Sequence, residues 1–165
     1  MKKLIAVFLA VMMLAGMNSA LAEDRYLGVM LSTNVMSLDT NLATDGESLE
    51  VIADCIDGLM QMDADGAAVP AIAESYDLSD DGTVYTFHLR DAKWSNGEDV
   101  TAYDFVYAWK RIAKEAGEYA YLMDTSVGCI KNADDIIYNG ADPDTLGVEA
   151  LDARPFVVTL EVPVS

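Results

Sequence analysis

An alternating run of side chains at residues 84–90 constrains the fold of this chain more than any other segment. Tyr85, Phe87 and Leu89 point to one side of the extended chain, a pattern typical of a β-strand that buries one face. Asp80-Asp81-Gly82 comes directly before the run, and an Asp-Gly pair in this position favours a hairpin. The sequence therefore predicts a hairpin whose second strand is half-buried.

An amphipathic helix is predicted soon after this strand. Residues 94–97, Trp-Ser-Asn-Gly, form a turn sequence. Thr101 then suits an N-cap, and Asp104 stands three residues later, where a capping box places its acid. The face expected to be buried carries Phe105, Val106, Trp109 and Ile112.

The rest of the chain is interpreted as short strands, turns and further helical segments. A helix is predicted over residues 48–60, with one apolar face that includes Leu49, Ile52 and Ile56, and with Gly58 near its end. The other expected elements are a strand at 26–31, a turn at 63–66, a loop or short helix at 68–75, a partly helical segment at 115–124 and a hairpin formed by 148–150 and 156–162.

Residues 1–22 have the order of a secretory signal peptide. Lys2 and Lys3 form a basic start, residues 4–16 are uncharged and mostly apolar, and Ala20-Leu21-Ala22 is a small-x-small cleavage site. The apolar run is shorter than the roughly 20 residues that a membrane-spanning helix needs. The mature chain is therefore expected to begin at Glu23, to be exported and to make no direct membrane insertion.

Charge and cysteine usage narrow the possible partners and chemistry. The chain has 10 basic and 28 acidic residues, a formal net charge of −18, which repels phosphate backbones and argues against nucleic-acid binding. The acids are interpreted mainly as a solvated surface, with attraction of cationic ligands as the alternative. An oxidising compartment permits a disulfide between Cys55 and Cys129, but the sequence does not show that they meet, and Cys55 falls on the apolar side of a predicted helix.

Catalysis has little support in the sequence. His88 lies in the middle of the predicted strand, and the chain contains no Gly-x-Ser-x-Gly, His-Glu-x-x-His or phosphate-binding glycine loop. The acidic pairs lie in turn-like or polar surface sequence, and the aromatic residues Trp94, Tyr103, Tyr107 and Trp109 are interpreted as core. We therefore expect no catalytic residues, no metal site and no cofactor.

One stretch, residues 73–111, resembles a known family. It contains Ala73-Glu74-Ser75-Tyr76, Ser79-Asp80-Asp81-Gly82, Tyr85-Thr86-Phe87-His88-Leu89-Arg90, Lys93-Trp94-Ser95-Asn96-Gly97 and Val100-Thr101-Ala102-Tyr103-Asp104-Phe105-Val106-Tyr107-Ala108-Trp109-Lys110-Arg111. This order resembles the signature of the peptide-binding family of extracytoplasmic solute receptors, the oligopeptide- and dipeptide-binding proteins of ATP-driven importers. Ser37-Leu38-Asp39, Asp57-Gly58-Leu59 and Leu146-Gly147-Val148 agree with it, and the last is typical of the oligopeptide branch.

The resemblance implies a two-lobed, hinged α/β receptor of the type II periplasmic-binding-protein fold, with a mixed sheet, flanking helices and hairpins. Members of the family are much longer, so residues 23–165 are expected to be an N-terminal fragment that covers part of the first lobe. The implied function is the capture of a peptide, by a monomer, for delivery to a membrane permease.

Ligand-binding residues follow from the same resemblance. In the oligopeptide branch, the stretch after Ser-Leu-Asp lies against the main chain of a bound extended peptide, which implies Thr44, Asp45 and Gly46 as ligand contacts. Tyr119 lies in a tyrosine-rich segment that resembles one lining the ligand cleft. The family's anchor for the peptide's amino group is expected beyond Ser165.

Two departures from the family pattern bear on these expectations. Thr40 stands where the family usually has proline after Asp39, which is expected to loosen that turn. Met17 follows Leu14-Ala15-Gly16, where lipoprotein relatives have cysteine, so no lipid anchor is expected.

Rival interpretations stay open at this point. The same architecture accommodates nickel, haem, sugars or antimicrobial peptides as ligands, because a fold does not fix its ligand. A secreted hydrolase would need a nucleophile–base pair, and an acidic adhesion module should show repeats or a low-complexity stalk.

Export gives the first testable prediction. We expect cleavage between Ala22 and Glu23 and no acyl modification, because the small-x-small site is present and a cysteine is absent at position 17. N-terminal sequencing and the intact mass of the exported protein measure both. A start at residue 17, or an added hydrophobic mass, would contradict the prediction.

Overall fold

The computed structural model describes residues 28–164, and its contacts separate residues up to Ser32 from the unit that follows. The expected signal peptide and cleavage site lie outside the described residues. The described part of the predicted first strand, residues 28–31, has no regular structure, so that prediction is wrong there. A strand needs a neighbour to satisfy its backbone groups, and within residues 28–164 both sheets use other segments.

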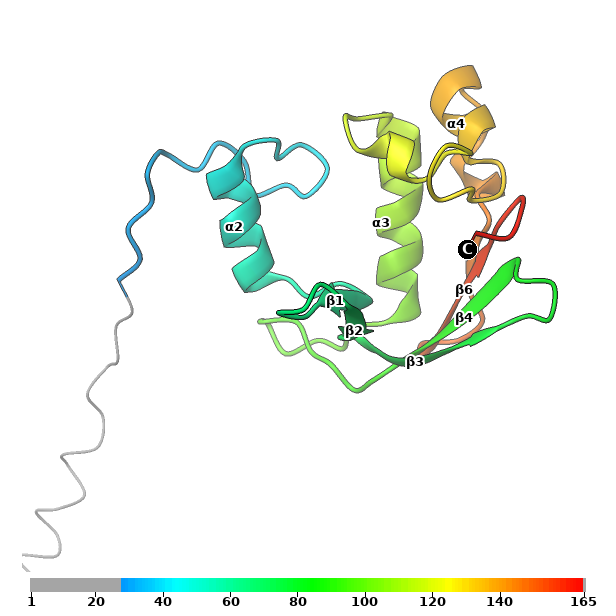
Figure 1. Cartoon of the computed structure of the whole chain (residues 1–165), viewed down its shortest axis with the longest axis horizontal. Coiled ribbons are helices and arrows are strands. Elements are labelled where there is room, and N and C mark those ends of the chain that lie inside the picture. Colours follow the sequence, from blue (N-terminus) through cyan, green and yellow to red (C-terminus); the bar gives the residue numbers. More distant parts are fainter. Residues whose placement is uncertain (1–27, 165) are drawn as a thin grey trace, which may run out of the picture. The chain divides into compact units, whose positions relative to one another are not determined.

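A four-stranded antiparallel sheet forms the centre of the unit that begins at Thr33 (Figure 1). Its strand order is β3 (Ala73–Leu78), β4 (Val84–Leu89), β6 (Pro155–Thr159) and β5 (Val148–Ala150). The predicted hairpin is confirmed as β3–β4: Gly82 has a φ of +72°, and the Asp81 carboxylate accepts hydrogen bonds from the backbone amide and hydroxyl of Thr83. The predicted second hairpin is confirmed as β5–β6.

A smaller hairpin joins β1 (Met60–Met62) to β2 (Ala68–Pro70). Its turn is the predicted one, because the Asp63 carboxylate accepts hydrogen bonds from the amides of Asp65 and Ala67, both at 2.9 Å, and Gly66 has a φ of +80°. Residues 68–75 were expected to be a loop or short helix, and this is wrong. Pro70 stands at the end of an edge strand, a position that tolerates a missing amide donor.

Helix α3 (Ala102–Glu115) packs against β5 and β6 (Figure 1). Its predicted cap is confirmed, since the Asp104 carboxylate accepts hydrogen bonds from the backbone amide of Thr101 at 2.7 Å and from its hydroxyl at 2.9 Å. The four residues predicted to face inward all pack against the buried cluster. Phe156 of β6 is fully buried, with ring centroids 5.7 Å from Phe105 and 5.2 Å from Trp109.

Helix α2 (Gly46–Cys55) is shorter than predicted and begins two residues earlier. Its C-cap is Ile56, in an extended conformation, rather than a residue near Gly58. Two residues of the face expected to be buried are exposed, Leu49 by 40% and Ile56 by 44%, and Cys55 is exposed as well. Residues 48–60 contain most of α2 and the start of β1. The apolar residues of these two elements together have the spacing of one longer helix, which explains the error.

The chain between α3 and β5 forms η2 (Ala120–Leu122), α4 (Ala133–Asn139) and η3 (Pro143–Thr145). The short helix α4 was not predicted. Cys129 is buried, and both cysteines are free thiols, so the structure contains no disulfide between them. Within residues 28–164, no helix is long and apolar enough to cross a membrane.

The position of Phe156 gives a stability prediction. Phe156→Ala is expected to lower the free energy of unfolding by about 3–5 kcal/mol, because a fully buried ring is lost from under α3. Trp109 is half-buried, so Trp109→Ala should cost less. Urea unfolding of the full-length protein measures both, with Tyr103→Ala, 57% exposed, as the control. Equal losses for Phe156→Ala and Tyr103→Ala would show that this packing does not limit stability.

Candidate functional site

The predicted ligand contacts Thr44, Asp45 and Gly46 belong to residues 36–48, a loop together with the first three residues of α2, which we call the site loop. Its two ends are joined through Ser48, whose side chain is fully buried. The Ser48 hydroxyl oxygen accepts hydrogen bonds from the amides of Met36 at 2.9 Å and Ser37 at 3.1 Å. One buried hydroxyl therefore closes the base of the site loop.

The three predicted contacts differ in how much they offer a ligand. Thr44 and Gly46 are exposed, and a Cβ added at Gly46 would have nothing within 4 Å. The Asp45 carboxylate accepts the amide of Ser48 at 2.9 Å and thereby caps α2, so this side chain is already in use. This part of the site loop therefore presents to solvent the exposed Thr44 and Gly46, with open space where a side chain at Gly46 would stand.

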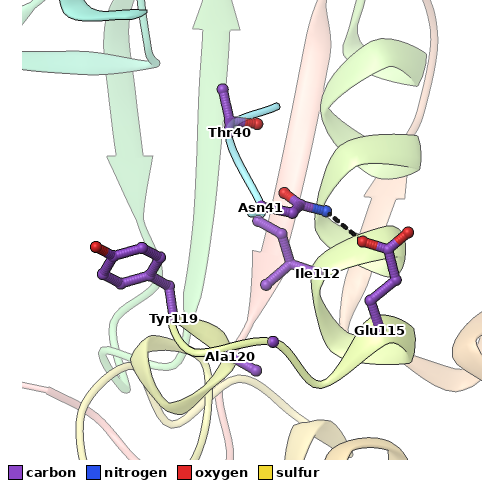
Figure 2. A pocket seen from close by; sticks show the side chains of 7 residues that line it. Thr40, Asn41, Ile112, Glu115, Tyr119 and Ala120 are labelled. Carbon is purple, nitrogen blue, oxygen red and sulfur yellow. Dashed lines mark hydrogen bonds between the residues drawn. The ribbon is translucent and has the colours of Figure 1, made fainter. Parts of the chain in front are cut away.

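Arg111 of α3 holds the middle of the site loop. Its Nη1 and Nη2 donate to the two carboxylate oxygens of Asp39 at 3.1 and 2.5 Å, and its Nε donates to Glu115 at 2.9 Å. The second carboxylate oxygen of Glu115 accepts from the Asn41 side chain at 3.1 Å (Figure 2). We call Arg111, Glu115, Asp39 and Asn41 the Arg111 clamp. The planar fork of the guanidinium allows one side chain to bind both acids.

The pKa values of the clamp move in the directions that this geometry requires. Hydrogen bonds from Arg111, and then from the Asn41 amide, lower the pKa of Asp39 below its ordinary value. Hydrogen bonds from Asn41 and Arg111 lower the pKa of Glu115, and the two acids raise the pKa of Arg111. The Arg111 and Asp39 side chains are 31% and 30% exposed, so this pair is partly shielded from water.

Tyr119 lies where the site loop meets the segment after α3. A cavity of about 20 Å³ separates them, which is room for about one water molecule. It is lined by Thr40, Asn41, Ile112, Glu115, Gly117, Tyr119 and Ala120 (Figure 2). The structure thus brings Tyr119 to Thr40 and Asn41, whereas Thr44, Asp45 and Gly46 do not line this cavity. Tyr119 and the other three predicted contacts therefore do not line the same pocket.

Thr40 also lines a larger open depression of about 800 Å³. Its walls come from the end of α2, the segment after β4 and the N-terminal half of α3, and include Trp94 and Tyr107. Trp94 and Tyr107 are 43% and 71% exposed, and Tyr103 is exposed as well, so the expectation that these three are core is wrong. They lie on the turn or on the side of α3 away from Phe156, where no strand of the sheet covers them.

The clamp was not predicted from the sequence, although both residues of its Asp39–Arg111 ion pair lie in segments that the sequence analysis discussed. Asp39 and Arg111 each lie in a segment that carried the resemblance, and they have opposite charges. They are separated by 72 positions, so no local spacing rule connects them. Glu115 and Asn41 gave no signal of their own.

Comparisons with known proteins show which family the chain is similar to. Residues 67–165 match the family model of bacterial extracellular solute-binding proteins, family 5 Middle. A dipeptide-binding protein of Lactococcus lactis is 42% identical over 153 residues, which cover 91% of this chain and 27% of that protein. The periplasmic oligopeptide-binding protein OppA of Salmonella typhimurium is 38% identical over 174 residues, which cover 99% of this chain and 32% of that protein.

A solved structure agrees with the sequence comparisons. The structure of Listeria monocytogenes OppA bound to peptide superimposes with a TM-score of 0.75 at 41% identity, covering 82% of this chain and 26% of that chain. The resemblance and the fold class are confirmed, since the mixed α/β segment matches part of an OppA-type periplasmic binding protein. The family's description as solute-binding proteins also confirms the expectation of a binding protein rather than an enzyme. The chain spans about a quarter to a third of the length of these relatives.

The lowered pKa values give a pH prediction for the clamp. The ordinary pKa values of Asp39 and Glu115 are 3.8 and 4.5, and both are lower in the folded protein. The clamp's contribution to stability is therefore complete above about pH 4.5 and is lost as the pH falls through the lowered folded values. We expect the unfolding free energy, measured from about pH 6 down to about pH 2, to fall less steeply for Asp39→Asn than for the wild type. Parallel curves would contradict the prediction.

Proposed function

Because the chain belongs to the bacterial extracellular solute-binding proteins of family 5, we propose that the protein containing it captures peptides outside the cytoplasmic membrane. It then delivers them to the membrane permease of an ATP-driven importer. The observation that carries the proposal is the 41% identity and 0.75 TM-score to a receptor solved with a peptide bound. The identities to dipeptide- and oligopeptide-binding proteins support the same ligand class.

The contact that we propose for the ligand uses backbone at Thr44, Asp45 and Gly46. The Asp45 side chain caps α2, and Gly46 has no side chain, so neither residue imposes a side-chain preference. An extended peptide that pairs with main chain is held by groups that every residue type shares. Tyr119, which lines the same small cavity as Asn41, supplies an aromatic surface beside the site loop. This combination suits a receptor that accepts many peptide sequences.

The proposal also covers the cellular location of the protein, its processing and its oligomeric state. We infer export with cleavage after Ala22 and a mature monomer without a lipid anchor, supported by the signal sequence and by a relative named as periplasmic. Residues 23–165 would then supply one wall of a cleft between two lobes. Closure of the second lobe would exclude water from the ligand's backbone groups, which makes their hydrogen bonds more favourable.

Substitution at Gly46 tests the proposed contact. Gly46→Leu is expected to weaken several peptides of unrelated sequence by a similar factor, because the new side chain enters the space beside shared backbone. Since a Cβ at Gly46 meets nothing within 4 Å, the change should leave the unfolding free energy nearly unchanged. Calorimetry of the full-length protein with a small peptide panel measures the dissociation constants.

Ala53→Leu is the matched control, because it introduces the same side chain at an exposed position of α2. An effect of Gly46→Leu on one peptide only would place the contact elsewhere. Absence of binding by the wild type to every peptide in the panel would argue for another solute of this family.

A further inference from the structure

We propose that Arg111 is a positioning residue for ligand binding: through Asp39 and Glu115 it holds the site loop in its binding position before a ligand arrives. This inference rests on the proposed function, because it assumes that the site loop contacts the ligand. Arg111 itself is not placed at the ligand. It acts directly on Asp39, and through Glu115, whose carboxylate also accepts a hydrogen bond from Asn41.

Apolar packing does little to fix the site loop. Its large apolar side chains point outward: Met36, Leu38 and Leu42 are 78%, 61% and 60% exposed. Its buried side chains are small or polar, namely Ala43, Asn41 and Ser48. A segment that buries so little apolar area gains little from the hydrophobic effect, so its position must depend on polar attachments.

Two sets of hydrogen bonds attach the site loop. Ser48 joins the two ends of the loop to each other, and this determines its closure. The hydrogen bonds described between the site loop and α3 within residues 33–164 come from the Arg111 clamp, which joins Asp39 to Arg111 and Asn41 to Glu115. The hydrogen bonds of Ser48 therefore close the loop, and the Arg111 clamp determines where the closed loop lies relative to α3.

Helix α3 is a firm support for this attachment. Its inner face packs against Phe156 through Phe105 and Trp109, and its N-terminus is capped by Asp104. Glu115 is the last residue of α3, and Tyr119 follows four residues later beside Asn41. The clamp therefore attaches the site loop to the end of the helix that Tyr119 follows in sequence.

The chemistry of the clamp requires arginine. The guanidinium donates to two carboxylates in fixed directions, one of them through two nitrogen atoms. A lysine ammonium carries the same charge but has no planar fork, so it cannot reproduce this arrangement. Arg111→Lys should therefore behave more like a loss of the clamp than like a conservative change.

The expected size of the effect follows from population shift. If the loop occupies its binding position one tenth of the time without the clamp, the apparent dissociation constant rises about tenfold. We expect rises of this order for Arg111→Lys and Asp39→Asn in the full-length protein, measured by calorimetry with the peptide panel. The double variant should be little weaker than either single variant, because both remove the same attachment.

Lys110→Gln is the matched control, because Lys110 is the neighbouring residue on α3 and its ion pair with the exposed Asp144 lies outside the clamp. Its dissociation constants should match those of the wild type. Hydrogen exchange without ligand supplies the second measurement. In the clamp variants, the amides of Leu42 and Ala43, which donate to the Asp39 carbonyl, should exchange much faster, while the amides of β4 and β6 should accelerate at most by the smaller factor that corresponds to the loss of global stability.

The two measurements separate failure of this proposal from failure of the proposed function. If the wild type binds peptides and the clamp variants bind them equally well, Arg111 is not a positioning residue. Exchange that accelerates equally in β4, β6 and the site loop would show a general loss of stability and also overturn the proposal. If the wild type binds no peptide, the proposed function fails, and the exchange data still show whether the clamp orders the loop.

Discussion

The packing of Phe156 against α3 is the contact on which the rest of the unit depends. Phe156 lies on an inner strand of the sheet, is fully buried and contacts rings on β4 and on two turns of α3. It therefore joins the sheet to the one long helix of residues 33–164. Because the sheet fixes α3, the far end of that helix can fix Arg111 and Glu115, and through them a loop with little apolar packing of its own.

Local pattern was sufficient to predict the elements in this central part. The alternation at residues 84–90 predicted β4, the Asp-Gly turn predicted its hairpin, and the Thr101–Asp104 pair predicted the start of α3. These features depend on neighbours only a few residues apart, so single-sequence reasoning identifies them. The inward face of α3 was also correct, because an amphipathic helix on a sheet buries the side that its spacing defines.

The errors arose where tertiary context decides between local alternatives. Residues 48–60 have helical spacing throughout, yet Met60 pairs with Pro70 in a hairpin and α2 ends at Cys55. For the candidate site, the resemblance identified the site loop and Tyr119 as regions, but it did not predict the clamp that connects them. That connection joins residues on separate elements, and nothing in either local sequence specifies the other.

The separation of 72 positions between Asp39 and Arg111 also has a consequence for the order of folding. The β3–β4 hairpin closes through residues only a few positions apart, whereas the clamp attaches the site loop to α3 through residues 72 positions apart. The pairing of β4 with β6 spans a similar separation, but apolar burial on both strands offsets the chain entropy lost in closing it. The site loop, which lacks such burial, should therefore be the last segment to order during folding and the first to detach in the native state, while the sheet stays intact.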